Sequence, residues 1–164
     1  MNNISDKSIK VLQAVSKNDF SDVNTLWRAY HKWLDYEACF DHFDDELKNL
    51  PGTYAAPAGA LLLAQDRHAG KTVGIVGLRP KNDNVVEIKR LYILPEYQGR
   101  GLGRHLTEIC LSIAKTAGYE QVYLETLTKL VAAQYLYKSM GFVDLRNSAC
   151  DTNSEIIGME YDVL

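Results

Sequence analysis

The chain has 164 residues, of which 46% are hydrophobic and 24% are charged, and its formal net charge at pH 7 is −3. This length supports a single domain over residues 1–164 with a substantial core, and the acidic balance lacks the basic footprint of a nucleic-acid-binding protein. No apolar run approaches the roughly 18 residues of a membrane-spanning helix and the polar start has no signal-peptide core, so we expect a cytoplasmic protein.

The N-terminal third is predicted to contain one strand and two helices. Hydrophobicity alternates weakly over residues 8–15, as it does in a strand. Apolar residues then recur at helical spacing from Val23 to Leu34 after capping side chains at Asp19–Asp22, and a second helical stripe runs from Phe40 to Leu50. We interpret four aromatic residues of the two stripes as core, namely Trp27, Tyr30, Phe40 and Phe43. We interpret the acidic residues near the start of the second helix as solvated, namely Asp41, Asp44, Asp45 and Glu46.

Three strands are predicted next, over Leu61–Gln65, Thr72–Arg79 and Val85–Ile93. The loop Asp66–Gly70 contains the Asp and Gly that favour a chain reversal. Strands joined by such short turns pair antiparallel, so we expect a three-stranded meander. Pro95 ends the third strand, because proline has no N–H group for a sheet hydrogen bond.

A glycine-rich turn links the third of these strands to a long helix. Residues 98–104 read Gln-Gly-Arg-Gly-Leu-Gly-Arg, and helical spacing of apolar residues continues from Leu102 to Ile113. The start of a helix carries unpaired N–H groups and the positive end of the helix dipole, which attract phosphate. The P-loop and Rossmann spacings are both absent, so the turn indicates a phosphate or pyrophosphate site without specifying the ligand.

The C-terminal third completes an alternation of strands and helices. We expect a strand over Gln121–Thr126, a helix from Lys129 to Met140 that stops at Gly141, and final strands over Phe142–Leu145 and Ile156–Tyr161. The order of elements predicts an α/β fold with helices packed on a mixed sheet.

The cysteines and histidines suggest no metal site. Cys39, Cys110 and Cys150 are widely spaced and form no CxxC pair, which predicts free thiols rather than a disulfide framework or a zinc site. The histidines have no companions at metal-ligand spacing, and none is placed to activate a cysteine.

Three features together resemble the GCN5-related N-acetyltransferase (GNAT) family. Gln98, Gly101 and Gly103 fill the family's motif A, Gln/Arg-x-x-Gly-x-Gly/Ala, which lies between its fourth strand and third helix. Glu87 lies eleven residues before Gln98, where protein-acetylating members place a catalytic glutamate. The segment AQYLYKSMGF, residues 133–142, resembles motif B, A-x-x-L-Y-x-x-x-G-F.

The resemblance implies the single-domain GNAT fold, a mixed and mostly antiparallel sheet flanked by helices. In that fold the fourth and fifth strands run parallel and splay apart to admit the pantetheine arm of acetyl-CoA, the acyl donor, and no metal takes part. Backbone groups of the central strand and the glycine-rich turn would bind the cofactor, while the two arginines of the turn would either support it or remain solvated. The residues expected to bind the cofactor are Leu91, Tyr92, Ile93, Gln98, Gly99, Arg100, Gly101, Leu102, Gly103 and Arg104.

The same resemblance implies two catalytic side chains. An amine is largely ammonium near pH 7 and must lose a proton, for which Glu87 is the candidate base, directly or through a water. Tyr137 matches the motif B tyrosine that protonates the departing thiolate. Alternatively, Glu87 is an exposed strand residue, with Lys89 on the same face of the strand and Arg90 on the other. Tyr137 could likewise be a packing residue of its helix, and the nearby Tyr135 could be confused with it.

The acceptor is the least specified part. The resemblance places the N-terminal helices over the acceptor side and implies a primary amine, which we expect to belong to a small molecule. A protein lysine or N-terminus and a catalytically silent acyl-CoA sensor are the alternatives, neither nucleic acid nor a membrane is expected as a partner, and a homodimer is left open. Leu130 stands where many relatives have a cofactor-contacting Asn. Arg79 could bind a substrate carboxylate, but we favour a loop-side cation.

Overall fold

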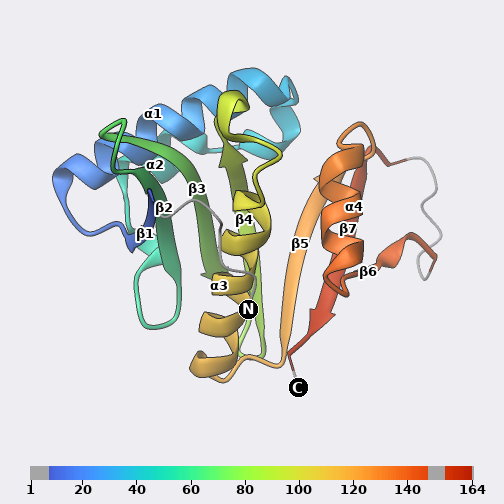
Figure 1. The fold of residues 1–164 in the computed structure, drawn as a ribbon. Coiled ribbons are helices and arrows are strands. Elements are labelled where there is room, and N and C mark those ends of the chain that lie inside the picture. The colour runs from blue at the N-terminus through green and yellow to red at the C-terminus, as the bar shows by residue number, and fades with distance from the viewer. Residues whose placement is uncertain (1–7, 148–153, 164) are drawn as a thin grey trace.

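A computed structural model describes residues 8–147 and 154–163, which form a seven-stranded sheet with helices on both faces (Figure 1). The strands are β1 Ile9–Gln13, β2 Ala60–Asp66, β3 Lys71–Pro80, β4 Val85–Ile93, β5 Gln121–Leu127, β6 Val143–Asp144 and β7 Ile156–Asp162. The helices are α1 Lys17–Leu34, α2 Phe43–Lys48, α3 Leu102–Ala117 and α4 Val131–Ser139. Short 3-10 turns lie at Glu37–Phe40, Gly52–Tyr54, Pro95–Tyr97 and Leu145–Asn147.

The strand order across the sheet is β1-β2-β3-β4-β5-β7-β6. The first four strands pair antiparallel in chain order, which confirms the predicted meander. β4 and β5 pair in parallel, with α3 as the crossover between them, and β7 then pairs antiparallel with both β5 and β6. The predicted mixed, mostly antiparallel sheet is therefore confirmed.

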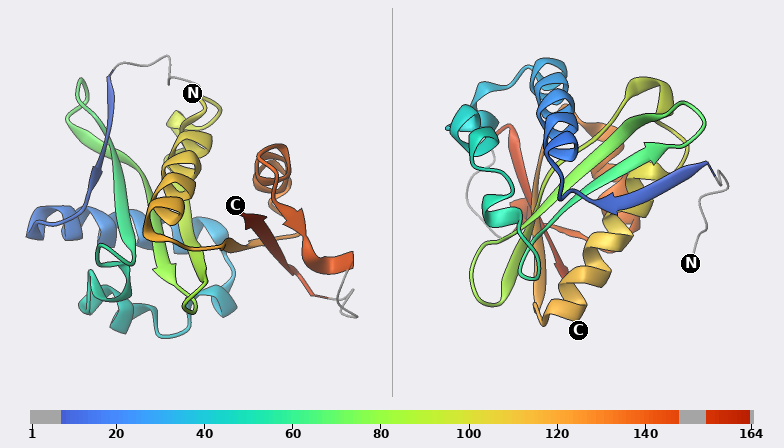
Figure 2. Two further views of the ribbon diagram at one scale, coloured as in Figure 1. Left: turned by 90° about the horizontal axis from the view of Figure 1, so that it is seen from below. Right: turned by 90° about the vertical axis from the view of Figure 1, so that its left-hand side faces the viewer.

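The sheet separates two hydrophobic cores, and the views in Figure 2 show α3 and α1 on opposite faces of it. On one face, the apolar stripe of α3 packs with α4 against β2 to β5; its buried members are Leu102, Leu106, Cys110 and Ala114. On the other face, α1 and α2 bury Val23, Leu26, Trp27, Leu34, Phe43 and Leu47. Each helix pair is amphipathic and turns its apolar side to the sheet.

Several element boundaries differ from the sequence-based expectations: β1 and α4 are shorter by one or two residues at each end, and three further differences affect α1, α2 and β6. α1 begins earlier than predicted, because Ser16 forms a capping box with Asp19. The second predicted helix is divided into a 3-10 turn and α2, since His42 has a φ of +58° and turns the chain between them. β6 has only two residues and continues as a 3-10 turn rather than as the predicted four-residue strand.

Candidate active site

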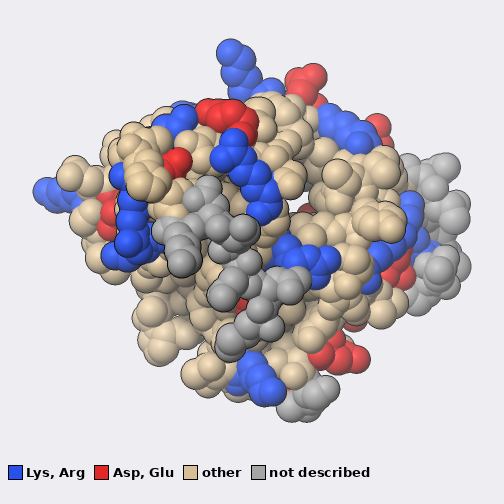
Figure 3. Space-filling view, viewed as in Figure 1, with Lys and Arg blue, Asp and Glu red and all other residues tan. Residues whose placement is uncertain are grey.

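β4 and β5 pair over four residues and then separate. The pairs run from Val85 with Gln121 to Ile88 with Leu124, beyond which β4 continues only against β3 and β5 only against β7. The two strands diverge in Figure 1, and the space-filling view from the same side has an opening through the molecule at this place (Figure 3). The splay implied by the sequence resemblance is thus present.

A bulge in β4 lies at the start of the diverging segment. Residues 75–77 of β3 pair with residues 89–92 of β4, so β4 carries one residue more, and Arg90 has a φ of +54°. The extra residue breaks the simple alternation of side chains. Arg90 therefore lies on the α1/α2 face together with Glu87 and Lys89, and the expectation that it faces the opposite way is wrong.

The glycine-rich turn presents a row of free backbone donors. The N–H groups of residues 99–104 have no hydrogen-bond acceptor in the part of the chain that the structure describes. Gly99 and Gly101 have φ values of +75° and +81°, which L side chains rarely adopt, and a Cβ added to either would meet no atom within 4 Å. Residues 99–101 are exposed, Gly103 and Arg104 are half-buried, and Leu102 buries its side chain in the core, so the turn lies at the surface.

Three side chains hold this turn against its surroundings. Gln98 Nε2 donates to the carbonyl oxygen of Ile93 at 2.9 Å, which fastens the turn to the end of β4. Arg100 Nη2 donates to a carbonyl of the preceding 3-10 turn at 2.9 Å. Arg104 Nη2 donates to Ser139 Oγ at 2.5 Å and so connects α3 with α4. Both arginines flank the free N–H groups.

Glu87 lies on the α1/α2 face, one residue before the last β4–β5 pair. Its side chain is 7% exposed, and its two oxygens contact different cations. Oε2 accepts a hydrogen bond from Arg79 Nε at 3.1 Å, and Oε1 lies 3.6 Å from Lys89 Nζ. The alternative of an exposed strand residue is therefore wrong for Glu87. Arg79 belongs to β3 and lies directly opposite Glu87, so it is not a loop cation.

Tyr137 projects from α4 into the core on the α3 side and is 6% exposed. Burial raises its pKa, and the neighbouring Tyr30 and Cys110 raise the pKa further, so its hydroxyl keeps its proton near neutral pH. Tyr30 comes from α1, on the opposite face of the sheet, and the Tyr137 ring packs edge-to-face on Phe142 with centroids 5.5 Å apart. Tyr135, by contrast, is 79% exposed.

Aromatic rings from α1 line the α1/α2 side of the diverging segment of β4. The ring of Tyr30 stacks on that of Tyr92 with centroids 5.4 Å apart, and the Trp33 ring lies 5.9 Å from Tyr92. Trp33 is 47% exposed beside them and was not predicted from the sequence. The interpretation as core is confirmed for Trp27, Phe40 and Phe43.

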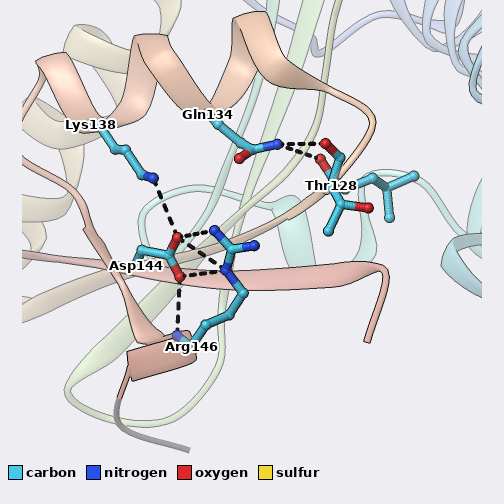
Figure 4. Close-up of polar contacts among 6 residues, drawn as sticks. Thr128, Gln134, Lys138, Asp144 and Arg146 are labelled. Carbon is cyan, nitrogen blue, oxygen red and sulfur yellow. Dashed lines mark hydrogen bonds and ion pairs between the residues drawn. The ribbon is translucent and has the colours of Figure 1, made fainter. Parts of the chain in front are cut away.

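Polar contacts anchor α4 at both ends (Figure 4). Gln134 Nε2 donates to the carbonyl oxygens of residues 127 and 128, at the end of β5. Asp144 accepts hydrogen bonds from Arg146 and lies 3.4 Å from Lys138 Nζ, and these cations hold the pKa of its carboxyl well below the usual range. Leu130 packs against the α1/α2 core instead of supplying a polar group.

A buried ion pair between α2 and β4 was missed by sequence reasoning. Arg90 Nη2 donates to Glu46 Oε2 at 2.6 Å, and Glu46 Oε1 accepts from the Tyr54 hydroxyl at 2.5 Å. Glu46 is only 18% exposed, so its assignment to a solvated helix start is wrong. The available signal was its spacing, because Glu46 follows Phe43 by three residues on the apolar side of α2.

The cysteines that the structure describes offer no nucleophile. Burial raises the pKa of the Cys110 thiol to about 12, which leaves it inert near neutral pH. The Cys39 side chain and Cys150 lie outside the described residues. Within residues 8–147 and 154–163, no cluster of His, Cys, Asp and Glu could hold a metal ion, and no helix is long and apolar enough to cross a membrane.

The chain matches the family model described as acetyltransferase (GNAT) over residues 20–142. An uncharacterized N-acetyltransferase of Schizosaccharomyces pombe is 36% identical over 141 residues, covering 85% of this chain and 83% of the relative. An acetyltransferase from Streptococcus agalactiae superposes with a TM-score of 0.80 at 16% identity, over 96% of this chain and 99% of its own. A GNAT family acetyltransferase from Elizabethkingia anophelis with acetyl-CoA bound has a TM-score of 0.67 at 18% identity. The match covers 96% of this chain and 99% of that acetyltransferase.

Proposed function

The chain belongs to the acetyltransferase (GNAT) family of acetyl-CoA-dependent acyltransferases, and on that premise we propose that it acetylates a primary amine of a small molecule by direct attack in a ternary complex. The observation that carries the proposal is the separation of β4 and β5 beside the glycine-rich turn. An opening between the strands lets the donor lie against α3 and α4 while the acceptor enters from the α1/α2 face (Figure 3).

The residues around the opening fit the donor. The free N–H groups of residues 99–104 at the start of α3 suit a pyrophosphate, with Arg100 and Arg104 beside them. On its β5 side, the main chain of residues 89–93 has no strand partner. We assign its groups near Leu91 and Tyr92 to the pantetheine amides and the thioester oxygen, since Gln98 already occupies the Ile93 carbonyl. Acetyl-CoA supplies an acyl group already activated as a thioester.

Glu87 and Tyr137 lie on opposite faces of the sheet. Glu87 is suited to removing a proton from the acceptor, and Tyr137 is suited to donating a proton to the leaving group. Glu87 faces the acceptor side, where an ammonium must lose a proton before it can attack. Because both carboxylate oxygens of Glu87 contact cations, we assign it the role of base acting through one water. Tyr137 keeps its proton because its pKa is raised, and it is assigned the protonation of the departing thiolate.

Replacing Gly101 by valine tests the pyrophosphate assignment. A Cβ at this position would meet no protein atom within 4 Å, so the valine side chain would occupy open space beside the turn and strain its backbone. Hydrogen bonds to a charged group are each worth about 1.5–3 kcal/mol, so the Kd for acetyl-CoA is expected to rise about ten- to hundredfold in isothermal titration calorimetry. Gly118→Val is the matched control, because Gly118 has a φ of +85° with equally open surroundings at the other end of α3. Equal affinities in the two folded variants would exclude the turn as the binding site.

Native mass spectrometry with acetyl-CoA and a pooled panel of amino acids, polyamines, aminoglycosides and lysine peptides tests the function itself. The expected result is a bound cofactor together with a mass gain of one acetyl group on a small-molecule member. Acetylation of the peptides alone would favour a protein acceptor. Binding without any product across the panel would favour an acyl-CoA sensor, and absence of cofactor binding would contradict the proposal entirely.

A further inference from the structure

Five ionised side chains gather on the α1/α2 face where β4 leaves β5. Arg79 and Lys89 contact Glu87, and Arg90 contacts Glu46. The two groups adjoin each other, because the Tyr54 hydroxyl that donates to Glu46 lies close enough to both Arg79 and Arg90 for their charges to influence its pKa. This cluster contains three cations and two carboxylates.

The cluster is largely removed from water. The exposed fractions of its side chains are 34% for Arg79, 18% for Lys89, 6% for Arg90, 18% for Glu46 and 7% for Glu87. An excess positive charge in such surroundings is costly unless an anion compensates it. In addition, Nε and Nη1 of Arg90 are buried without a hydrogen-bond partner and face the rings of Phe40 and Phe43 instead.

Neighbouring carboxylates do not remove this excess. Asp44 of α2 is 70% exposed and pairs with Arg28. Glu125 lies on β5 and is exposed to water, which screens its charge. Lys81 adds a further cation on this side, with its ammonium 4.1 Å from the centroid of the Tyr123 ring. Glu160 lies on β7, beyond Tyr123 in the register of the sheet. The Arg79–Glu87 ion pair alone would match the charges of these two facing residues of β3 and β4. Lys89 is therefore the cation in excess.

We propose that the acceptor amine carries a carboxylate, bound by Lys89 with Arg79, so that the acceptor is an amino acid. The proposal rests on the acetyltransferase function proposed above and names its acceptor class. Lys89 is the first β4 residue beyond the last β4–β5 pair, and its ammonium lies 3.6 Å from the Glu87 carboxylate. An ammonium and a carboxylate joined by one carbon match this neighbouring anion and cation: the amine lies toward Glu87, with the bridging water between them, and the carboxylate contacts Lys89.

Matched acceptor pairs test this inference. Each of several amino acids is compared with its own carboxamide, which keeps the amine and the side chain but lacks the negative charge. The carboxamide cannot form the charged hydrogen bond to Lys89, so the wild-type protein is expected to favour the acids by about ten- to hundredfold in kcat/KM, mainly through KM. Lys89→Gln should reduce this preference to within about threefold, whereas Lys89→Arg should retain most of it. Lys81→Gln is the matched control and should behave as the wild type.

If neither member of any amino acid–carboxamide pair is acetylated, a binding measurement tests the carboxylate site instead. Ligand-observed NMR on the coenzyme A complex should then show that the acids bind and the amides do not. Lys89→Gln should abolish binding of the acids. Equal use or equal retention of acids and amides by the wild-type protein, retention of neither, or a preference that survives unchanged in Lys89→Gln, would overturn the carboxylate site. Failure of the proposed function is separate, because it would appear as an absence of acetyl-CoA binding in calorimetry.

Discussion

Tyr137→Phe is expected to lower kcat about ten- to a thousandfold while the Kd for acetyl-CoA stays within about twofold. The substitution removes only the hydroxyl that we assign to protonation of the leaving thiolate. The ring would keep its edge-to-face contact with Phe142, whose centroid is 5.5 Å away, and the core on the α3 side would remain filled. A loss confined to kcat is therefore attributable to proton transfer.

Tyr135→Phe is the matched control, since Tyr135 lies on the same helix with 79% of its surface exposed and should tolerate loss of its hydroxyl. Release of free coenzyme A under single-turnover conditions measures the chemical step for both variants. Because burial raises the pKa of Tyr137, the wild-type rate should not fall as pH approaches the ordinary tyrosine value of about 10 through loss of this proton. Unchanged single-turnover rates in Tyr137→Phe would remove Tyr137 from the mechanism.

The elements that the sequence predicted well are those specified by local pattern. The alternation and turns of residues 60–93 predicted the meander, and the apolar spacing after Leu102 predicted α3, because hydrophobic periodicity records which side of an element is buried. Two glycines of the turn could also be interpreted from the sequence, since the positive φ values of Gly99 and Gly101 favour that residue type. The separation of β4 and β5 came only from family resemblance, because strand pairing between distant segments leaves no local signal.

The residues that the sequence did not predict depend on one bulge. Strict alternation along β4 assigned Arg90 to the face opposite Glu87, but the extra residue at the bulge turns it toward α2. The bulge has no signature in the neighbouring sequence. The spacing of Glu46 from Phe43 indicates only that Glu46 is partly buried, and it does not identify the partner, Arg90, 44 residues away in the chain. The α1/α2 side, which we assign to the acceptor, is therefore built from contacts between residues far apart in the sequence.

Glu46→Ala is expected to destabilise the protein by about 3–5 kcal/mol, because it leaves the buried Arg90 cation without its carboxylate. Arg90 is 6% exposed, and Nη2 is its only guanidinium nitrogen with a hydrogen-bond partner among the described residues. The Tyr54 hydroxyl would lose its acceptor as well. Urea unfolding followed by circular dichroism measures the change as a lower midpoint with an unchanged slope.

Two further variants separate the ion pair from the helix that carries it. Asp44→Ala removes a carboxylate from the same helix, but Asp44 and its partner Arg28 are 70% and 52% exposed, so the expected cost is at most about 1 kcal/mol. Adding Arg90→Met to Glu46→Ala removes the uncompensated charge and should recover much of the lost stability, as a methionine can pack between Phe40 and Phe43. If the double variant were no more stable than Glu46→Ala, the cost would lie in α2 packing rather than in the buried charge. The Glu46–Arg90 ion pair would then not be needed to stabilise the β4 bulge on the side that we assign to the acceptor.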